Sequence, residues 1–219
     1  ITSPYTPSTP GAHSITAKSG NLTSAAVVVT VNVPANSVVA NGTAATTDLS
    51  IMYYLGSTES GDNVFVANPY NQVGTGETAT YPNDVYVYFT SAQEAGAEFL
   101  TLPEVGEYAF GLPTATKATI DANVFINSQE ILETETTTDA TWNLSSLTVS
   151  ETAQSWAFTY SIKLANGSYV YGDFNGDFEF INQASRNAAR STDSKIKVVT
   201  VTPAELQATL TAVLAKNKR

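Results

Sequence analysis

The run from Asp173 to Asp177 has the residue types and spacing of a cation site. Asp173, Asn175 and Asp177 match the first half of a calcium loop, in which oxygen ligands at alternate positions surround a hard cation. The match then ends, because Phe178 replaces the glycine and Ala184 replaces the glutamate that an EF-hand requires. Two interpretations remain: a calcium site on these three residues, or acids that flank an Asn-Gly turn.

Aromatic rings beside amide side chains indicate a second kind of chemistry, the binding of carbohydrate. Trp142 follows the polar stretch 136–141, and Tyr70 lies close to Asn68 and Asn71. Aromatic rings cover the apolar faces of sugars, while neighbouring polar groups bond the hydroxyls. The sequence therefore predicts a ligand site at Trp142 and Tyr70, with core packing as the alternative for Trp142.

Hydrolytic chemistry in this chain would have to use carboxylates. The chain has no cysteine, and His13 is its only histidine, so zinc sites built from several histidines are excluded. Glycoside hydrolysis needs two Asp or Glu side chains that face each other across a cleft. Glu130, Glu133 and Glu135 share one polar stretch, but no spacing selects a catalytic pair, and a solvated loop is the alternative.

The distribution of charge argues against nucleic acid as a partner. Residues 1–185 contain three lysines and 18 acidic residues, whereas residues 186–219 contain seven basic residues and two acidic ones. Nucleic-acid binding requires a basic footprint, which the acidic body lacks. The basic end is expected to pack against the body or remain solvated, and a lipid or partner contact is the alternative.

Strand-favouring residues and turn residues alternate along most of the chain, as in an antiparallel sandwich. No apolar run is long enough to span a membrane, and the longest, Ala25–Val31, fits a buried strand. Residues 68–82 are expected to form a long loop. The body is expected to be one sandwich, and two β subdomains that meet near 70–82 are the alternative. The predicted strands are Ala25–Val33, Asp48–Leu55, Asn63–Ala67, Asp84–Thr90, Glu107–Phe110, Ala118–Ile126, Trp142–Val149 and Lys195–Val201.

The clearest local prediction is a hairpin that starts at Trp156. Alternate residues from Trp156 to Leu164 are apolar, and the dipeptide Asn166-Gly167 suits a two-residue type I′ turn. Such a turn would place Ile162 opposite Tyr171. A second turn is expected at Asn175-Gly176.

The two ends differ from this β-rich body, which spans residues 12–201. Residues 1–11 contain three prolines and are expected to form an extended leader. Thr202, Pro203 and Glu205 meet the rules for a helix start, so residues 202–219 predict an α-helix. The apolar face of this helix is expected to dock on the body. The alternative is that it contacts another subunit through Leu206, Leu210 and Leu214.

Part of the chain resembles modules of exported surface lipoproteins of Bacteroidetes. The resembling segments are Val85–Phe89, Leu102–Tyr108, Ala118–Ile120, Phe158–Gly167 and Tyr171–Gly176, which together fall within residues 84–180. In that group a strand, a G-x-Y turn and a hairpin that ends near Y-G-x-x-x-G recur in this order. The resemblance implies a cell-surface or periplasmic location and a role in adhesion or glycan handling, and it carries over no catalytic residue.

These observations predict an all-β, antiparallel β-sandwich with a C-terminal α-helix. The expected function is that of an exported, non-catalytic binding or adhesion module with carbohydrate as its ligand. One alternative is a structural subunit of a surface assembly. Another is a glycoside-active enzyme with an unrecognised carboxylate pair.

Overall fold

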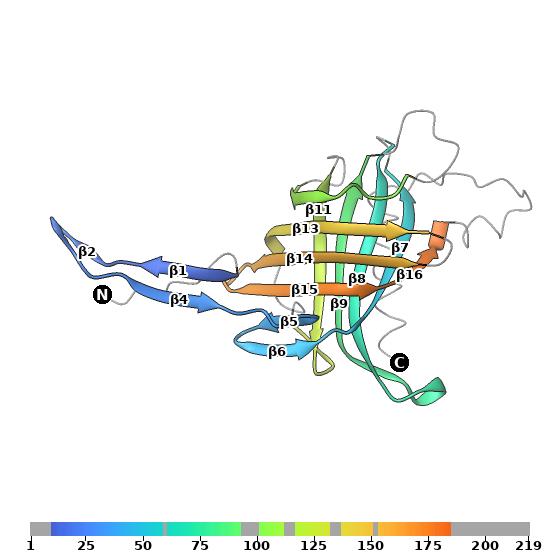
Figure 1. Cartoon of the computed structure of the whole chain (residues 1–219), viewed down its shortest axis with the longest axis horizontal. Helices are drawn as coiled ribbons and strands as arrows, with labels where there is room; N and C mark the ends of the chain where they lie inside the picture. The colour runs from blue at the N-terminus through green and yellow to red at the C-terminus, as the bar shows by residue number, and fades with distance from the viewer. Residues whose placement is uncertain are drawn as a thin grey trace, which may run out of the picture.

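The computed structural model describes residues 10–58, 61–92, 101–111, 117–131, 137–150 and 153–184. Over these residues the chain is almost entirely β-strand, and two many-stranded layers pack face to face, which confirms the predicted β-sandwich (Figure 1). Residues 1–9, the predicted strand 195–201 and the predicted helix 202–219 lie outside the described residues. Within the described part, no helix has the length and apolarity needed to cross a membrane.

The two layers are parts of one continuous hydrogen-bonded sheet. The first layer has the order β16-β7-β8-β9-β11, with β12 beside β11, and the second has the order β10-β13-β14-β15-β5-β6. The layers are joined by β10 and β11 and by the passage from β15 into β16, and their strands run crosswise in Figure 1. The strands are β5 (Ser37–Ala40), β6 (Thr43–Thr46), β7 (Leu49–Ser57), β8 (Asn63–Val73), β9 (Thr80–Ser91), β10 (Gly106–Phe110), β11 (Ala118–Ile126), β12 (Gln129–Glu130), β13 (Thr137–Val149), β14 (Gln154–Leu164), β15 (Tyr169–Asp177) and β16 (Glu179–Asn182).

Aromatic side chains fill the space between the layers. The predicted apolar face of β14, from Trp156 to Leu164, is buried, which confirms its period of two. Strand β9 is buried on both faces: Val87 and Phe89 join the main core, and Tyr88 on the opposite face joins a smaller cluster. Burial of such alternating rows is the main source of stability in a sandwich.

A glycine on β15 makes room for one of these rings. Gly172 lies directly opposite Tyr160 of β14. A Cβ atom at Gly172 would lie 1.8 Å from the Tyr160 ring, so no other residue fits without moving the ring. Burial raises the pKa of the Tyr160 hydroxyl, which keeps this side chain neutral.

The turn between β14 and β15 lies where it is expected, but the predicted turn type is wrong. The Gly167 amide donates to the Leu164 carbonyl at 2.9 Å, and Gly167 has a φ of 85°. This is a type I turn followed by a bulge glycine. It pairs Ile162 with Val170 instead of Tyr171, so Val170 faces the core. A shift of one residue moves every side chain of a strand to the other face.

The other two Asn-Gly dipeptides have different roles. Asn41 and Gly42 have φ values of 51° and 76° and join Ala40 directly to Thr43, as in a type I′ turn. By contrast, Asn175-Gly176 lies within β15, so the turn predicted there is wrong.

Residues 68–82 form a hairpin instead of the predicted long loop. Strands β8 and β9 continue through this region and pair up to Val73 and Thr80, and a short 3-10 helix at Gly76–Thr78 forms the tip. Both strands belong to the first layer, and their hairpin extends beyond it (Figure 1). The segment is thus an extension of one layer.

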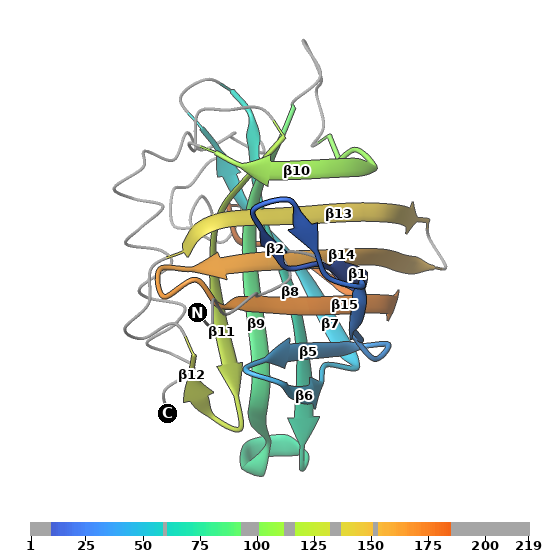
Figure 2. The same ribbon diagram turned by 90° about the vertical axis from the view of Figure 1, so that its left-hand side faces the viewer.

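A second hairpin projects from the sandwich as a two-stranded ribbon. Strand β1 (Gly11–Ile15) pairs with β4 (Val27–Val31), and β2 (Lys18–Ser19) pairs with β3 (Leu22–Thr23) at the tip (Figures 1 and 2). The strand predicted near Ala25–Val31 is thus present, but the expectation that it is buried is wrong, because four of the five residues of β4 are exposed.

Candidate functional site

The outer face of the first layer carries a pair of tyrosines at the base of the β8–β9 hairpin. The ring centroids of Tyr70 and Tyr81 lie 5.7 Å apart, with the planes inclined by 65°. Tyr70 is half-buried, and Tyr81 is 48% exposed. Leu49 of β7 lies opposite Tyr70 and is also exposed. These side chains form an apolar and aromatic surface that solvent can reach, which we call the tyrosine platform.

A buried carboxyl group lies beside the platform. Asp84 pairs with Tyr70 across the β8–β9 ladder and is 6% exposed. Its Oδ1 accepts a hydrogen bond from Asn68 Nδ2 at 2.5 Å, and its Oδ2 accepts one from the Tyr86 hydroxyl at 2.7 Å. Burial raises the pKa of Asp84 to about 6, although both hydrogen bonds act in the opposite direction. The network links β8, which carries Tyr70, to the neighbouring strand β9.

The surroundings of Tyr70 are negatively charged. Burial is the main cause of the raised pKa of the Tyr70 hydroxyl, and Tyr81, Glu179, Asp84 and Asp48 raise it further. Asp48 precedes β7, Asp84 lies in β9 and Glu179 begins β16, so carboxyl groups from three strand regions act on this hydroxyl. Such a field favours neutral or cationic ligands over anionic ones.

Asn83 anchors the base of the hairpin to its neighbours. Its Nδ2 donates to the carbonyl of Thr46 at 3.1 Å, and its Oδ1 accepts from the Asn127 amide at 3.1 Å. The Ser128 amide also donates to the Pro82 carbonyl at 2.7 Å. The strands that carry the tyrosine platform are therefore fixed by hydrogen bonds to neighbouring segments. This reduces the conformational entropy that is lost when a ligand binds.

Trp142, the first residue that the sequence suggests for ligand binding, lies in the core. It has no exposed surface, and its ring stacks on Phe89 of the opposite layer with centroids 4.0 Å apart. Tyr108 and Trp156 contact the same ring at 5.0 and 6.2 Å. The expectation that Trp142 offers a stacking surface is corrected, because Trp142 presents no face to a ligand.

The residues suggested for calcium lie along one extended strand. Asp173, Asn175 and Asp177 occupy alternate positions of β15, so their Cα atoms are spaced by roughly 7 Å and the outer two by about 13 Å. Calcium ligands must converge to within about 2.6 Å of the ion. Asp173 Oδ1 instead accepts a hydrogen bond from the backbone N–H of Asn36. The backbone N–H of Asn175 donates a hydrogen bond to Asn36 Oδ1. We therefore correct the calcium interpretation: the strand geometry separates these residues.

The other suggested chemical groups are spread over the molecule. His13 lies on the projecting ribbon, and Glu130 lies in β12. Glu133 and Glu135 fall outside the described residues. In the described part of the chain, no three His, Cys, Asp or Glu side chains gather as metal ligands would.

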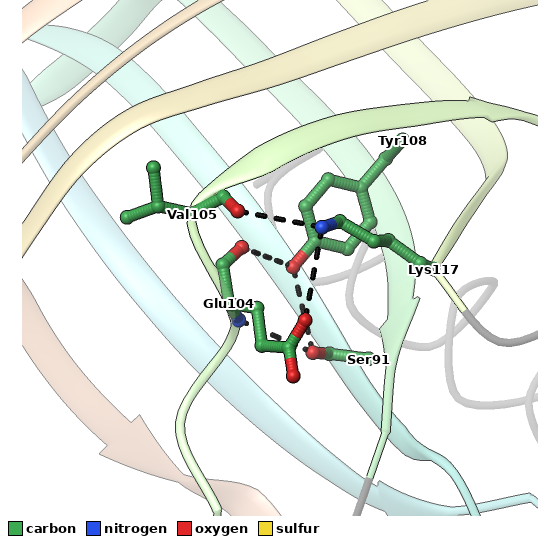
Figure 3. A network of polar contacts seen from close by, with 5 residues as sticks. All are labelled: Ser91, Glu104, Val105, Tyr108 and Lys117. Carbon is green, nitrogen blue, oxygen red and sulfur yellow. Dashed lines mark hydrogen bonds and ion pairs between the residues drawn. The ribbon is translucent and has the colours of Figure 1, made fainter.

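A second polar cluster lies where β10 meets β11. Lys117 Nζ is 3.7 Å from Glu104 Oε2, donates to the Val105 carbonyl at 3.3 Å and lies 5.5 Å from the centre of the Tyr108 ring (Figure 3). The Tyr108 hydroxyl donates to the Glu104 carbonyl at 2.6 Å, and its oxygen lies 3.4 Å from Ser91 Oγ. Each contact links segments within the protein, so the cluster braces the junction of the two layers.

Three residues of the platform and its support were not singled out in the sequence: Tyr81, Asp84 and Tyr86. The alternation of Asp84 and Tyr86 in β9 carries a usable signal, since both fall on the face opposite Val85 and Val87. Tyr81 carries no such signal, because it lies within a register shift between β8 and β9.

No known protein-family model, curated protein or solved structure matches this chain. The resemblance to exported lipoproteins therefore stays a prediction, and the site is interpreted from its own geometry.

Proposed function

We propose that this protein is a non-catalytic binding module that takes carbohydrate on the tyrosine platform. The observation that carries the proposal is the ring pair of the half-buried Tyr70 and the exposed Tyr81, which lies on strands fixed by hydrogen bonds beside amide and carboxylate groups. The ring faces would cover the apolar face of a sugar, and the polar groups nearby would bond its hydroxyls. An exported location is part of the proposal and rests on the resemblance.

The charge around the platform indicates which carbohydrates it accepts. Asp48 and Glu179 raise the pKa of the Tyr70 hydroxyl, and the chain has a net charge of −10. Sugars with carboxylate or sulfate groups would be repelled by this field, whereas neutral sugars and amino sugars would not. We therefore expect neutral or amino-bearing oligosaccharides as ligands.

A hydrolytic role is less well supported by the same residues. Asp84 has the raised pKa that a general acid needs, but both of its oxygens accept hydrogen bonds from Asn68 and Tyr86. It is also almost fully buried. We therefore assign Asp84 a structural role, in which it links the strands that carry the tyrosine platform.

The test is a glycan array with neutral, amino-bearing and acidic oligosaccharides, probed with the wild-type chain and with Tyr70→Ala and Tyr81→Ala variants. Tyr169→Ala is the matched control, because Tyr169 is half-buried and stacks on Tyr171 in the second layer. The proposal predicts binding to neutral or amino sugars that both platform variants lose and the control retains. An array without signal, or a signal that survives both platform variants, contradicts it.

A further inference from the structure

We propose that the projecting ribbon joins two copies of this chain, by antiparallel pairing of the outer edge of β4 with β4 of the second copy. This inference concerns a different element from the tyrosine platform and does not depend on carbohydrate binding.

The ribbon exposes apolar side chains that strands normally bury. Val27 and Val28 are 62% and 64% exposed, Val29 is 39% exposed, and Leu22 near the tip is 79% exposed. A two-stranded hairpin alone is at best marginally stable in water, and three or more strands are needed for independent stability. Addition of strands from a partner would supply what the ribbon lacks.

The edge of β4 lacks two features that normally prevent strand addition. Its sequence Val-Val-Val-Thr-Val contains no charge and no proline, and β1 is the strand that pairs with it in the described part of the chain. Charged residues and prolines are the usual protection of an edge strand. The edge strand β16 of the sandwich, by comparison, begins with Glu179.

Charge indicates that the partner is a second copy. The first acidic residue of the chain is Asp48, so the ribbon carries no Asp or Glu, and its charged side chain is Lys18. The ribbon projects away from the sandwich (Figure 1). Two copies that meet ribbon to ribbon therefore keep their acidic bodies apart, which most other contacts between two such chains would not do.

The length of β4 sets the register of the pairing. Val29 is the middle residue of Val27–Val31, so a symmetric antiparallel pair with full overlap places Val29 opposite Val29 of the second copy. Val28 then faces Thr30, and Val27 faces Val31. Residues directly opposite each other on antiparallel strands have Cβ atoms about 5 Å apart, and like charges at such positions repel.

This register is tested by charge exchange at Val29, with sedimentation velocity of the full chain as the readout. Wild type is expected to sediment as a dimer, Val29→Lys alone and Val29→Glu alone as monomers, and an equal mixture of the two variants as a dimer again. Val149→Lys is the matched control, because Val149 is an exposed valine at the end of β13, and it should remain dimeric. Recovery in the mixture separates a contact between copies from damage to the ribbon.

A cross-link provides a second readout that does not depend on charge. The chain has no cysteine, so Val29→Cys introduces a single thiol. Mild oxidation should join this variant into a disulfide-linked dimer, whereas Val149→Cys should remain largely monomeric on a denaturing gel. A wild-type chain that sediments as a monomer at its highest soluble concentration overturns the proposal. A dimer that survives Val29→Lys and Val29→Glu, without cross-linking through Val29→Cys, overturns it as well.

Discussion

Trp142 and Tyr70 have similar surroundings in the sequence and opposite surroundings in the structure. Each lies beside polar and amide residues, yet Trp142 is enclosed between the layers, whereas Tyr70 lies on the outer face of the first layer. The difference arises across the layers: Trp142 meets Phe89 from the opposite sheet, and Tyr70 meets Tyr81 from the adjacent strand. A ring is available to a ligand only where no second layer covers it.

The largest expected effect is on stability, from removal of the inner ring. Trp142→Ala removes a side chain that packs on Phe89, Tyr108 and Trp156, and should lower the free energy of unfolding by about 4 kcal/mol. Tyr81→Ala, at the exposed ring, should change it by less than about 1 kcal/mol. Urea denaturation of both variants checks the comparison, and equal losses would show that the two sites do not differ in burial.

A slightly smaller effect is expected from a methyl group under Tyr160. Gly172→Ala places a Cβ 1.8 Å from that ring. It should lower the free energy of unfolding by about 3 kcal/mol. Gly176→Ala on the same strand is the matched control, since its Cβ would lie 3.4 Å from the nearest atom of Phe174. If thermal unfolding shows the same midpoint for both variants, the close packing of Tyr160 on Gly172 is contradicted.

Asp84 should make the stability of the platform side depend on pH. Because its pKa is raised to about 6 in the folded state, the folded chain binds more protons than the unfolded chain between about pH 4 and 6. Stability therefore falls as the pH rises through this window, by on the order of 3 kcal/mol. Denaturation of wild type and Asp84→Asn from pH 4 to 8 measures this effect.

In the Asp84→Asn variant, the free energy of unfolding should not show this decrease between about pH 4 and 6. When each protein is referred to its own value at pH 4, the variant should therefore be more stable than wild type at pH 7. The other carboxylates titrate in both proteins, so the difference between the two curves isolates Asp84. Parallel curves would contradict the burial of this carboxyl group.

The sandwich was predictable because its alternation is local. The apolar face of β14 and the strand β11 can be read directly from the residues. The turns were less predictable, since Asn-Gly occurs at Asn41, Asn166 and Asn175 with three different geometries. The dipeptide permits a tight turn, but the pairing of the flanking strands decides whether one forms.

The site was predictable only in part, for a related reason. The amide side chains near Tyr70 indicate this residue in the sequence. Its partners Tyr81 and Asp84 lie across the β8–β9 ladder. The length of that ladder is not predictable, because the segment is rich in Gly, Thr and Asn and so resembles a loop. The exposure of β4 was missed because a run of valines is typical of a buried strand. At Tyr70 and at β4, the exposure of the side chains depends on which strand or layer packs against them.

The central claim is that the outer face around Tyr70, and not the inner face or the ribbon, receives the ligand. The most direct measurement is a titration of ¹⁵N-labelled protein with the oligosaccharide that gives the strongest array signal, followed by two-dimensional NMR. We predict that amide shifts concentrate at residues 68–71 and 81–84 and at the neighbouring residues 48–49 and 179. Shifts confined to β13–β15 or to the ribbon, or their absence at saturating ligand, would contradict the account.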